Sequence, residues 1–255
     1  ESPHLGMAQL QELREALLIF HKTGKPSWCF AETFGETSSG TGIYYLATAC
    51  KEIWLQPIGT VNLMGINIEL PFARGAFEKL DIKPEFAQRK EYKSFIEMYT
   101  REEFSEANRE ASQAIADSIL SQLVDGIARE RALSHDQVRY LINNGPYLTQ
   151  DALREKLVDR MDSRQNLVPI IREKLGQHIH FVSVGTYLHS LPHATKRDKV
   201  AVIFGSGIIQ RDGESSVLDD LVMSAHSIYK AFQLAANDKN VKAIVFRVNS
   251  SGGSP

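Results

Sequence analysis

The 255-residue sequence lacks the features that mark several large classes of protein. No apolar run approaches the ~18 residues that span a bilayer, and no charged segment followed by an apolar leader opens the chain. The 29 basic and 31 acidic residues nearly cancel, so a surface that binds polyanions is not expected. We therefore expect a segment that is soluble as it stands and does not bind nucleic acid.

Patterns for metals and cofactors are also sparse. The only cysteines, Cys29 and Cys50, have no CxxC spacing, so we predict buried core thiols, with a disulfide as the less favoured alternative. His178 and His180 stand two apart on an expected strand, a spacing more typical of surface residues than of metal ligands. The GSG at 205–207 lacks the full GxGxxG pattern of a dinucleotide site. No metal and no cofactor are predicted.

What the sequence does contain is an alternation of helical and strand patterns. Thr100 with Glu103 resembles a capping box at the start of a long helix, and Ser134 with Gln137 resembles another. Strands alternating with helices predict an α/β fold with parallel strand pairing. The predicted helices cover residues 7–23, 44–50, 72–80, 104–129, part of 145–159 and 217–236, and the predicted strands cover 27–33, 53–57, 60–68, 84–88, 199–210 and 241–249.

The stretch 185–198 has no periodicity and contains several turn-forming residues, which predicts a linker. The first domain is then expected over 1–184. Residues 199–255 contain a strand, a helix and a second apolar strand, which is a β-α-β unit and the expected beginning of a second domain.

Four stretches together carry a family resemblance. They are GKPSWCFAETFGETSSGTGIYYLATACKEIWLQPIGTVNLMG, QRKEYKSFIEMYT, LREKLVDRM and VKAIVFRVNSSGGSP, in this order along the chain. The sequence resembles the signal peptide peptidase A (protease IV) family in its long, two-domain form. The resemblance implies a crotonase/ClpP-like β-α superhelical domain followed by the start of a second, related domain.

The resemblance also implies a Ser/Lys dyad. The lysine of the family's Y-K-S is the general base, which is Lys93 here, and the nucleophilic serine is expected beyond Pro255. Gly252 and Gly253 follow an apolar strand where backbone N–H groups can form part of an oxyanion hole. The family's proline before these glycines is replaced by Ser251. By this interpretation the segment alone is inactive.

The chemistry sets a condition on Lys93. A lysine amine accepts a proton only when it is uncharged, and its ordinary pKa is ~10.4, so burial or a neighbouring charge must lower that pKa. Tyr92, Phe95 and Ile96 are the apolar neighbours that could enclose it. Without the resemblance, Lys93 is simply one of 29 basic side chains and is expected to be solvated.

A hydroxyl-rich loop lies at 35–42, and the resemblance implies that it corresponds to the nucleophile loop of the second domain. Thr41 aligns roughly with the family serine, and Ser38 and Ser39 lie beside it. The family does not use this copy for chemistry, so we predict that the loop is structural.

The resemblance further implies peptide substrates, namely cleaved signal peptides, and a homo-oligomer in the form of a tetramer-like ring. It implies that the full-length protein is associated with the bacterial inner membrane on its periplasmic side. Two alternatives remain open: an acyl-CoA-handling enzyme of the crotonase superfamily, and a non-catalytic oligomerisation module. Lys93 distinguishes the peptidase from both alternatives, since neither alternative needs a lysine at that position.

Overall fold

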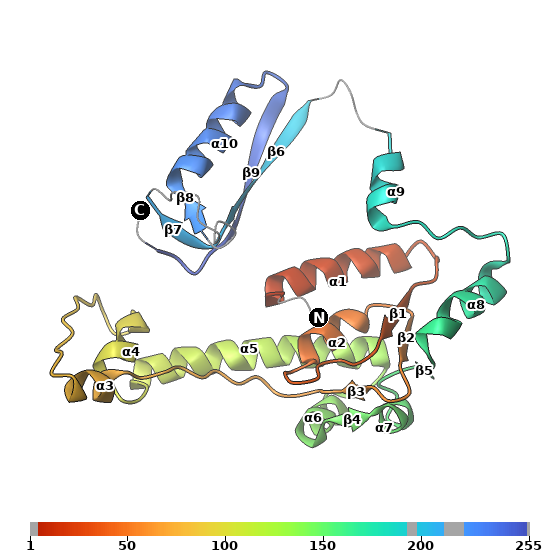
Figure 1. Cartoon of the computed structure of the whole chain (residues 1–255), viewed down its shortest axis with the longest axis horizontal. Coiled ribbons are helices and arrows are strands. Elements are labelled where there is room, and N and C mark those ends of the chain that lie inside the picture. The colour runs from red at the N-terminus through yellow and green to blue at the C-terminus, as the bar shows by residue number, and fades with distance from the viewer. Residues whose placement is uncertain (1–4, 193–197, 212–221, 254–255) are drawn as a thin grey trace. The chain divides into compact units, whose positions relative to one another are not determined.

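The computed structural model describes residues 5–192, 198–211 and 222–253 (Figure 1). The chain divides into two compact units, residues 1–179 and 180–255. Both units combine helices with strands, so the predicted α/β class is confirmed. Among the described residues, no helix has the length and apolar character that crossing a membrane requires.

A parallel three-stranded sheet organises the first unit. Strand β2 (Glu52–Leu55) lies between β1 (Trp28–Ala31) and β5 (Arg160–Met161). The chain crosses from β1 to β2 through helix α2 (Thr41–Ala47), which is the connection that a parallel pair requires. The apolar residues of β2 are fully buried, as expected for the central strand of a sheet covered on both faces.

Helices pack around this sheet to form one core. Its largest buried side chains come from β2, α2 and the second half of the long helix α5 (Glu106–Arg131). The remaining elements of this part are α1 (Met7–His21), β3 (Thr60–Val61), α6 (His135–Asn144), β4 (Tyr147–Leu148), α7 (Thr149–Arg154) and α8 (Arg164–Leu175). Strands β3 and β4 form a separate antiparallel pair.

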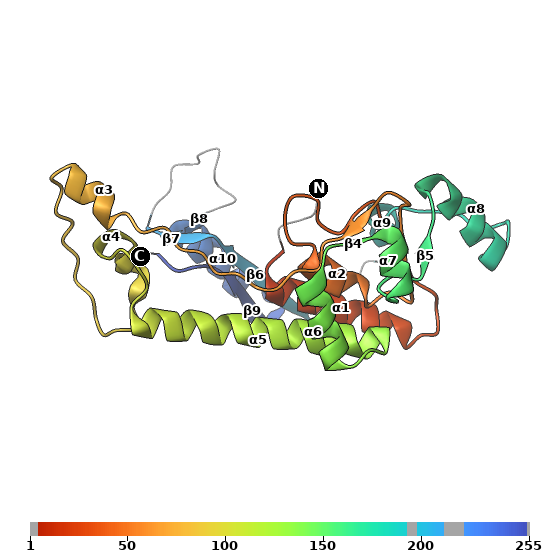
Figure 2. The ribbon, with the colours of Figure 1, turned by 90° about the horizontal axis from the view of Figure 1, so that it is seen from below.

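Residues 64–107, called the arm below, are built differently. The arm carries α3 (Arg74–Lys79), the 3₁₀ helix η1 (Ser94–Ile96) and α4 (Glu97–Thr100). Figures 1 and 2 both show α3 and α4 at the N-terminal end of α5, while the sheet lies near the other end of that helix. The first residues of the arm run from β3 along α5 to reach α3. The structure describes every residue of the arm, and only Glu97, which is 4% exposed, is buried.

The second unit contains the predicted β-α-β arrangement. Strand β6 (Lys199–Ser206) pairs in parallel with β9 (Val241–Asn249), and α10 (Ala225–Asn237) lies between them in sequence. Strands β7 (Ile208–Gln210) and β8 (Val222–Ser224) form a second parallel pair. Apolar side chains of β6 and β9 are exposed within this unit, namely Val200, Val202, Phe204, Ile244, Val245, Phe246 and Val248.

Several local predictions are wrong. The strand predicted over 84–88 is absent, and the one over 60–68 is reduced to β3. Part of the predicted linker forms α9 (Val184–Ser190), which Ser183 caps by accepting a hydrogen bond from the Thr186 amide. Residues 193–197 of that linker, and 217–221 of the predicted helix 217–236, lie outside the described residues.

The capping and cysteine predictions also need correction. Thr100 is the last residue of α4 and donates to the Ile96 carbonyl, so it does not begin the long helix. Ser105 caps α5 instead. Cys29 and Cys50 form a disulfide rather than remaining thiols, because β1 lies beside the start of β2 and brings their Cα atoms to 5.9 Å.

Candidate active site

Lys93 lies on the arm, immediately before η1. Its backbone amide donates to the Lys90 carbonyl at 3.4 Å, so the preceding residues form a turn, and its side chain is exposed. Of the three neighbours that we expected to enclose it, Tyr92 is 55% and Phe95 is 69% exposed in this unit, and Ile96 is half-buried. The catalytic role of Lys93 therefore stays a prediction.

The segment after Lys93 is tied to α5 through Glu97. One carboxylate oxygen of Glu97 accepts from the Ser105 hydroxyl at 2.6 Å. The other accepts from the Ser105 amide at 3.2 Å and from the Asn108 side-chain amide at 3.0 Å. Burial by itself raises the pKa of this carboxyl, but the hydrogen bonds from Ser105 and Asn108 outweigh burial and hold the pKa below its ordinary value. Glu97 is therefore a buried, ionised anchor that sequence reasoning missed.

Gly252 and Gly253 lie in the second unit, just after β9. Their φ angles of +105° and +151° are conformations that side chains other than glycine rarely adopt. A Cβ atom on Gly253 would lie 2.2 Å from the Ile209 carbonyl oxygen, so this position requires glycine for close approach to β7. The Gly252 amide donates to the Ser250 hydroxyl at 3.0 Å. Binding an oxyanion would require that amide to exchange partners, and the oxyanion role stays a prediction.

Two hydroxyl groups of the loop 35–42, those of Ser39 and Thr41, have structural roles. The Thr41 hydroxyl is buried, donates to the Met64 carbonyl at 2.7 Å and accepts from the Met64 amide at 2.7 Å. The Ser39 hydroxyl in turn donates to Thr41 Oγ1 at 3.1 Å. A hydroxyl held by both backbone groups of one residue is a structural bridge, which agrees with the predicted role of the loop.

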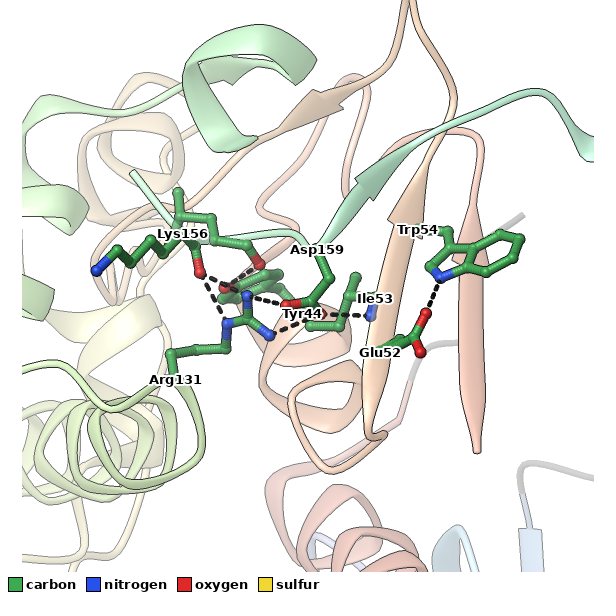
Figure 3. Close-up of polar contacts among 8 residues, drawn as sticks. Tyr44, Glu52, Ile53, Trp54, Arg131, Lys156 and Asp159 are labelled. Atoms are coloured by element: carbon green, nitrogen blue, oxygen red, sulfur yellow. Dashed lines mark hydrogen bonds and ion pairs between the residues drawn. The ribbon is translucent and has the colours of Figure 1, made fainter. Parts of the chain in front are cut away.

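The LREKLVDRM stretch forms a polar connection beside the start of β2 (Figure 3). Asp159 accepts two hydrogen bonds from the Arg131 guanidinium, each at 2.9 Å, and a third from the Ile53 amide at 2.7 Å. Arg131 also donates to the Lys156 carbonyl, and the buried Tyr44 hydroxyl donates to the Leu157 carbonyl. Burial raises the pKa of Tyr44, so it remains a neutral donor. Asp159 thus joins the end of α5 to the start of β2.

A second polar cluster holds α8 against the same sheet. Glu52 accepts from the Trp54 indole at 2.9 Å, as Figure 3 shows, and from the Lys174 ammonium at 2.6 Å. Burial tends to raise the pKa of Glu52, but the hydrogen bonds from Lys174 and Trp54 lower it overall. This cluster is a structural support of the sheet.

A metal is not indicated by the part of the chain that is described, where no cluster of His, Cys, Asp and Glu has a ligating arrangement. His178 and His180 belong to a turn and an irregular stretch, so the strand that would have aligned their side chains on one face is absent.

Comparison with known proteins identifies the relatives of this chain. The sequence model of peptidase family S49 matches residues 19–178. The chain is similar to "Serine protease SPPA, chloroplastic" of Arabidopsis thaliana, with 25% identity over 97% of this chain and 37% of the relative. It is also similar to "Protease 4" of Haemophilus influenzae, with 28% identity over 94% of this chain and 40% of the relative.

"Protease 4" of Salmonella typhi shows 28% identity over 96% of this chain and 40% of its own length. The chain thus spans about two fifths of the length of these curated relatives. The predicted relationship to the signal peptide peptidase A (protease IV) family is confirmed. Since the family match covers more than half of the chain, including the arm, this protein belongs to peptidase family S49.

Proposed function

We propose that this chain is part of a serine-type endopeptidase that uses a Ser/Lys dyad to degrade cleaved signal peptides. Lys93 is the general base, Gly252 and Gly253 contribute to the oxyanion hole, and the nucleophilic serine lies beyond Pro255. The family match carries the proposal, because it includes residues 19–178 and therefore Lys93. The names of the relatives, a serine protease and two proteases, support the same reaction class.

The proposed chemistry assigns a task to each group. A neutral Lys93 amine removes the proton from the serine hydroxyl as that oxygen attacks the peptide carbonyl. The same lysine then delivers this proton to the leaving amine. Backbone N–H groups of the glycine loop stabilise the negative charge that develops on the carbonyl oxygen. Water hydrolyses the acyl-enzyme and returns the serine to its starting state.

The position of Lys93 leaves it accessible to other parts of the longer protein, and the proposal requires those parts to enclose it, because a neutral amine needs burial or a neighbouring charge. An exposed lysine on an arm with almost no core of its own is available to a group outside its unit, whereas a lysine in the sheet core would not be. Several large apolar side chains of the arm are exposed to solvent in this unit, namely Leu80, Ile82, Phe86, Tyr92 and Phe95. Such a surface fits a segment that is covered by further parts of an assembly.

The proposal extends to fold and assembly. We propose a crotonase/ClpP-like β-α superhelix, in which the second unit begins the domain that contains the serine. The exposed apolar side chains of β6 and β9 support the presence of further structure over that sheet. We further propose a homo-oligomeric, tetramer-like ring associated with the periplasmic side of a bacterial inner membrane.

A serine-directed reagent tests the reaction class. The longer protein should cleave a fluorogenic signal-peptide mimic, and a fluorophosphonate should abolish turnover by labelling one serine beyond Pro255. The 255-residue chain alone should show neither turnover nor labelling. If the longer protein were inactive, or if it kept its activity after complete serine labelling, the proposal would be wrong. Turnover by the chain alone that Thr41→Ala or Ser39→Ala abolishes would move the active site to the first unit.

A further inference from the structure

We propose that Glu97 is a positioning residue for Lys93: its buried carboxylate fixes the Lys93 segment onto the first turn of α5. This inference rests on the proposed function, because it assumes that Lys93 is the base. Glu97 itself does not need to touch substrate.

The chain connects the two residues through η1, a helical segment of three residues. Lys93 immediately precedes η1, η1 ends at Ile96, and Glu97 is both the residue after η1 and the first residue of α4. No loop separates Lys93 from Glu97. A rotation or shift of Glu97 relative to α5 is therefore transmitted directly to the backbone of Lys93.

Glu97 is the buried anchor of this region. It is the only buried residue in the fully described arm, and its carboxylate receives three hydrogen bonds from two residues of the α5 N-terminus. One of the donors, Ser105, is also the cap of α5, so the anchor and the beginning of the helix are a single structure. Charge-assisted hydrogen bonds of this kind are stronger and more directional than neutral ones.

A second contact to α5 is made by Tyr92, the residue that precedes Lys93 in the sequence. The Tyr92 hydroxyl donates to Glu110 on α5 at 2.9 Å, and both side chains are exposed. Solvent competes for an exposed hydrogen bond, so this contact constrains the segment less than the buried one. The two contacts together hold the residues around Lys93 along the first turns of one helix.

A positioning role has consequences that a general structural role lacks. A displaced base lowers the rate of the chemical step while substrate binding is kept, because reaction requires the base within roughly 2.6–3.2 Å of the hydroxyl. The glutamine variant separates geometry from charge. An amide at position 97 can accept from the Ser105 and Asn108 amides and donate to the Ser105 hydroxyl, so it can keep the contacts without the negative charge.

The experiment compares Glu97→Ala, Glu97→Gln and the control Glu103→Ala in the longer protein. Glu103 is an exposed carboxylate of the same arm. The maximal rate and KM are measured with the fluorogenic peptide, and kcat is the maximal rate divided by the concentration of sites that a fluorophosphonate titrates to completion. We expect Glu97→Ala to lower kcat at least about 30-fold with KM within about threefold, while Glu97→Gln and Glu103→Ala stay within about threefold of wild type.

Each other result overturns the inference. If kcat per titrated site in Glu97→Ala is within twofold of wild type, Glu97 does not position the base. If Glu97→Gln is as impaired as Glu97→Ala, keeping the contacts does not keep the activity, and the positioning role of Glu97 fails. Should Lys93→Ala abolish turnover while Glu97→Ala does not, only this inference fails. Should Lys93→Ala remain active, the proposed dyad fails and the inference fails with it.

Discussion

The sheet core and the arm belong to the same unit but are stabilised by different interactions. The core buries large apolar side chains of β2, α2 and α5. Polar groups at its edge, such as Asp159, form hydrogen bonds to the backbone of β2. The arm buries one side chain, and that side chain is a carboxylate. Substitutions in the core should therefore change the free energy of unfolding, whereas substitutions in the arm should change the geometry of the Lys93 segment.

The largest expected difference between the two regions is tested by removing one large side chain from each. Trp54 in β2 is fully buried, so Trp54→Ala should lower the free energy of unfolding of the first unit by about 4 kcal/mol. Phe95 in the arm is 69% exposed, and Phe95→Ala should change it by less than about 1 kcal/mol. Urea unfolding followed by far-ultraviolet circular dichroism measures both. Equal losses would show that the arm has a core of its own.

A smaller effect is expected from the polar connection between α5 and β2. Asp159→Ala removes the carboxylate that pairs with the Arg131 guanidinium and accepts from the Ile53 amide, and leaves Arg131 with the Lys156 carbonyl, which should cost about 3 kcal/mol. Asp117→Ala, at an exposed position of α5, is the matched control and should cost less than about 0.5 kcal/mol. The same urea titration applies. If Asp159→Ala lowered the free energy of unfolding by less than about 1 kcal/mol, apolar packing alone would hold α5 against β2.

The smallest effect concerns pH and the arm. The folded-state pKa of Glu97 is lowered, so its contribution to stability is fully present above the unfolded carboxyl pKa of ~4.3 and is lost as the pH falls through the folded value. Amide hydrogen exchange over residues 97–108, corrected for intrinsic rates, should therefore show more frequent opening below pH 4 than at pH 7. Glu97→Gln, which does not titrate, should show no such rise. Opening that is independent of pH in the wild type would contradict the role of the ionised carboxylate.

The sequence predicted the apolar parts of the structure better than the polar ones. Strand β9 coincides with the predicted 241–249, and α1 and α5 depart from their predictions by a few residues, because apolar periodicity marks an element directly. The strand predicted over 84–88 is absent because its residues lie on the arm, where no neighbouring strand can pair with them. Strand propensity without a partner does not make a sheet.

The candidate site shows the same limit. Lys93 was found through a family resemblance and not through any local pattern, since one exposed lysine looks like any other in a sequence. Glu97 carried no signal, because its burial depends on Ser105 and Asn108 folding back over it from the next helix. The disulfide was missed for a related reason: Cys29 and Cys50 are neighbours only once β1 and β2 pair.

The measurement that tests the account most directly separates catalysis from folding at Lys93. Lys93→Ala, Lys93→Arg and the neighbouring control Lys90→Ala are compared in the longer protein for turnover of the fluorogenic peptide and for thermal stability. We predict that both Lys93 variants lose at least about 100-fold in kcat, because neither an alanine nor a guanidinium that stays protonated can accept a proton. Melting temperatures should stay within about 2 °C of wild type, because the side chain is exposed, and Lys90→Ala should keep its activity. A Lys93→Ala protein that turns over substrate within a few-fold of wild type would contradict the account.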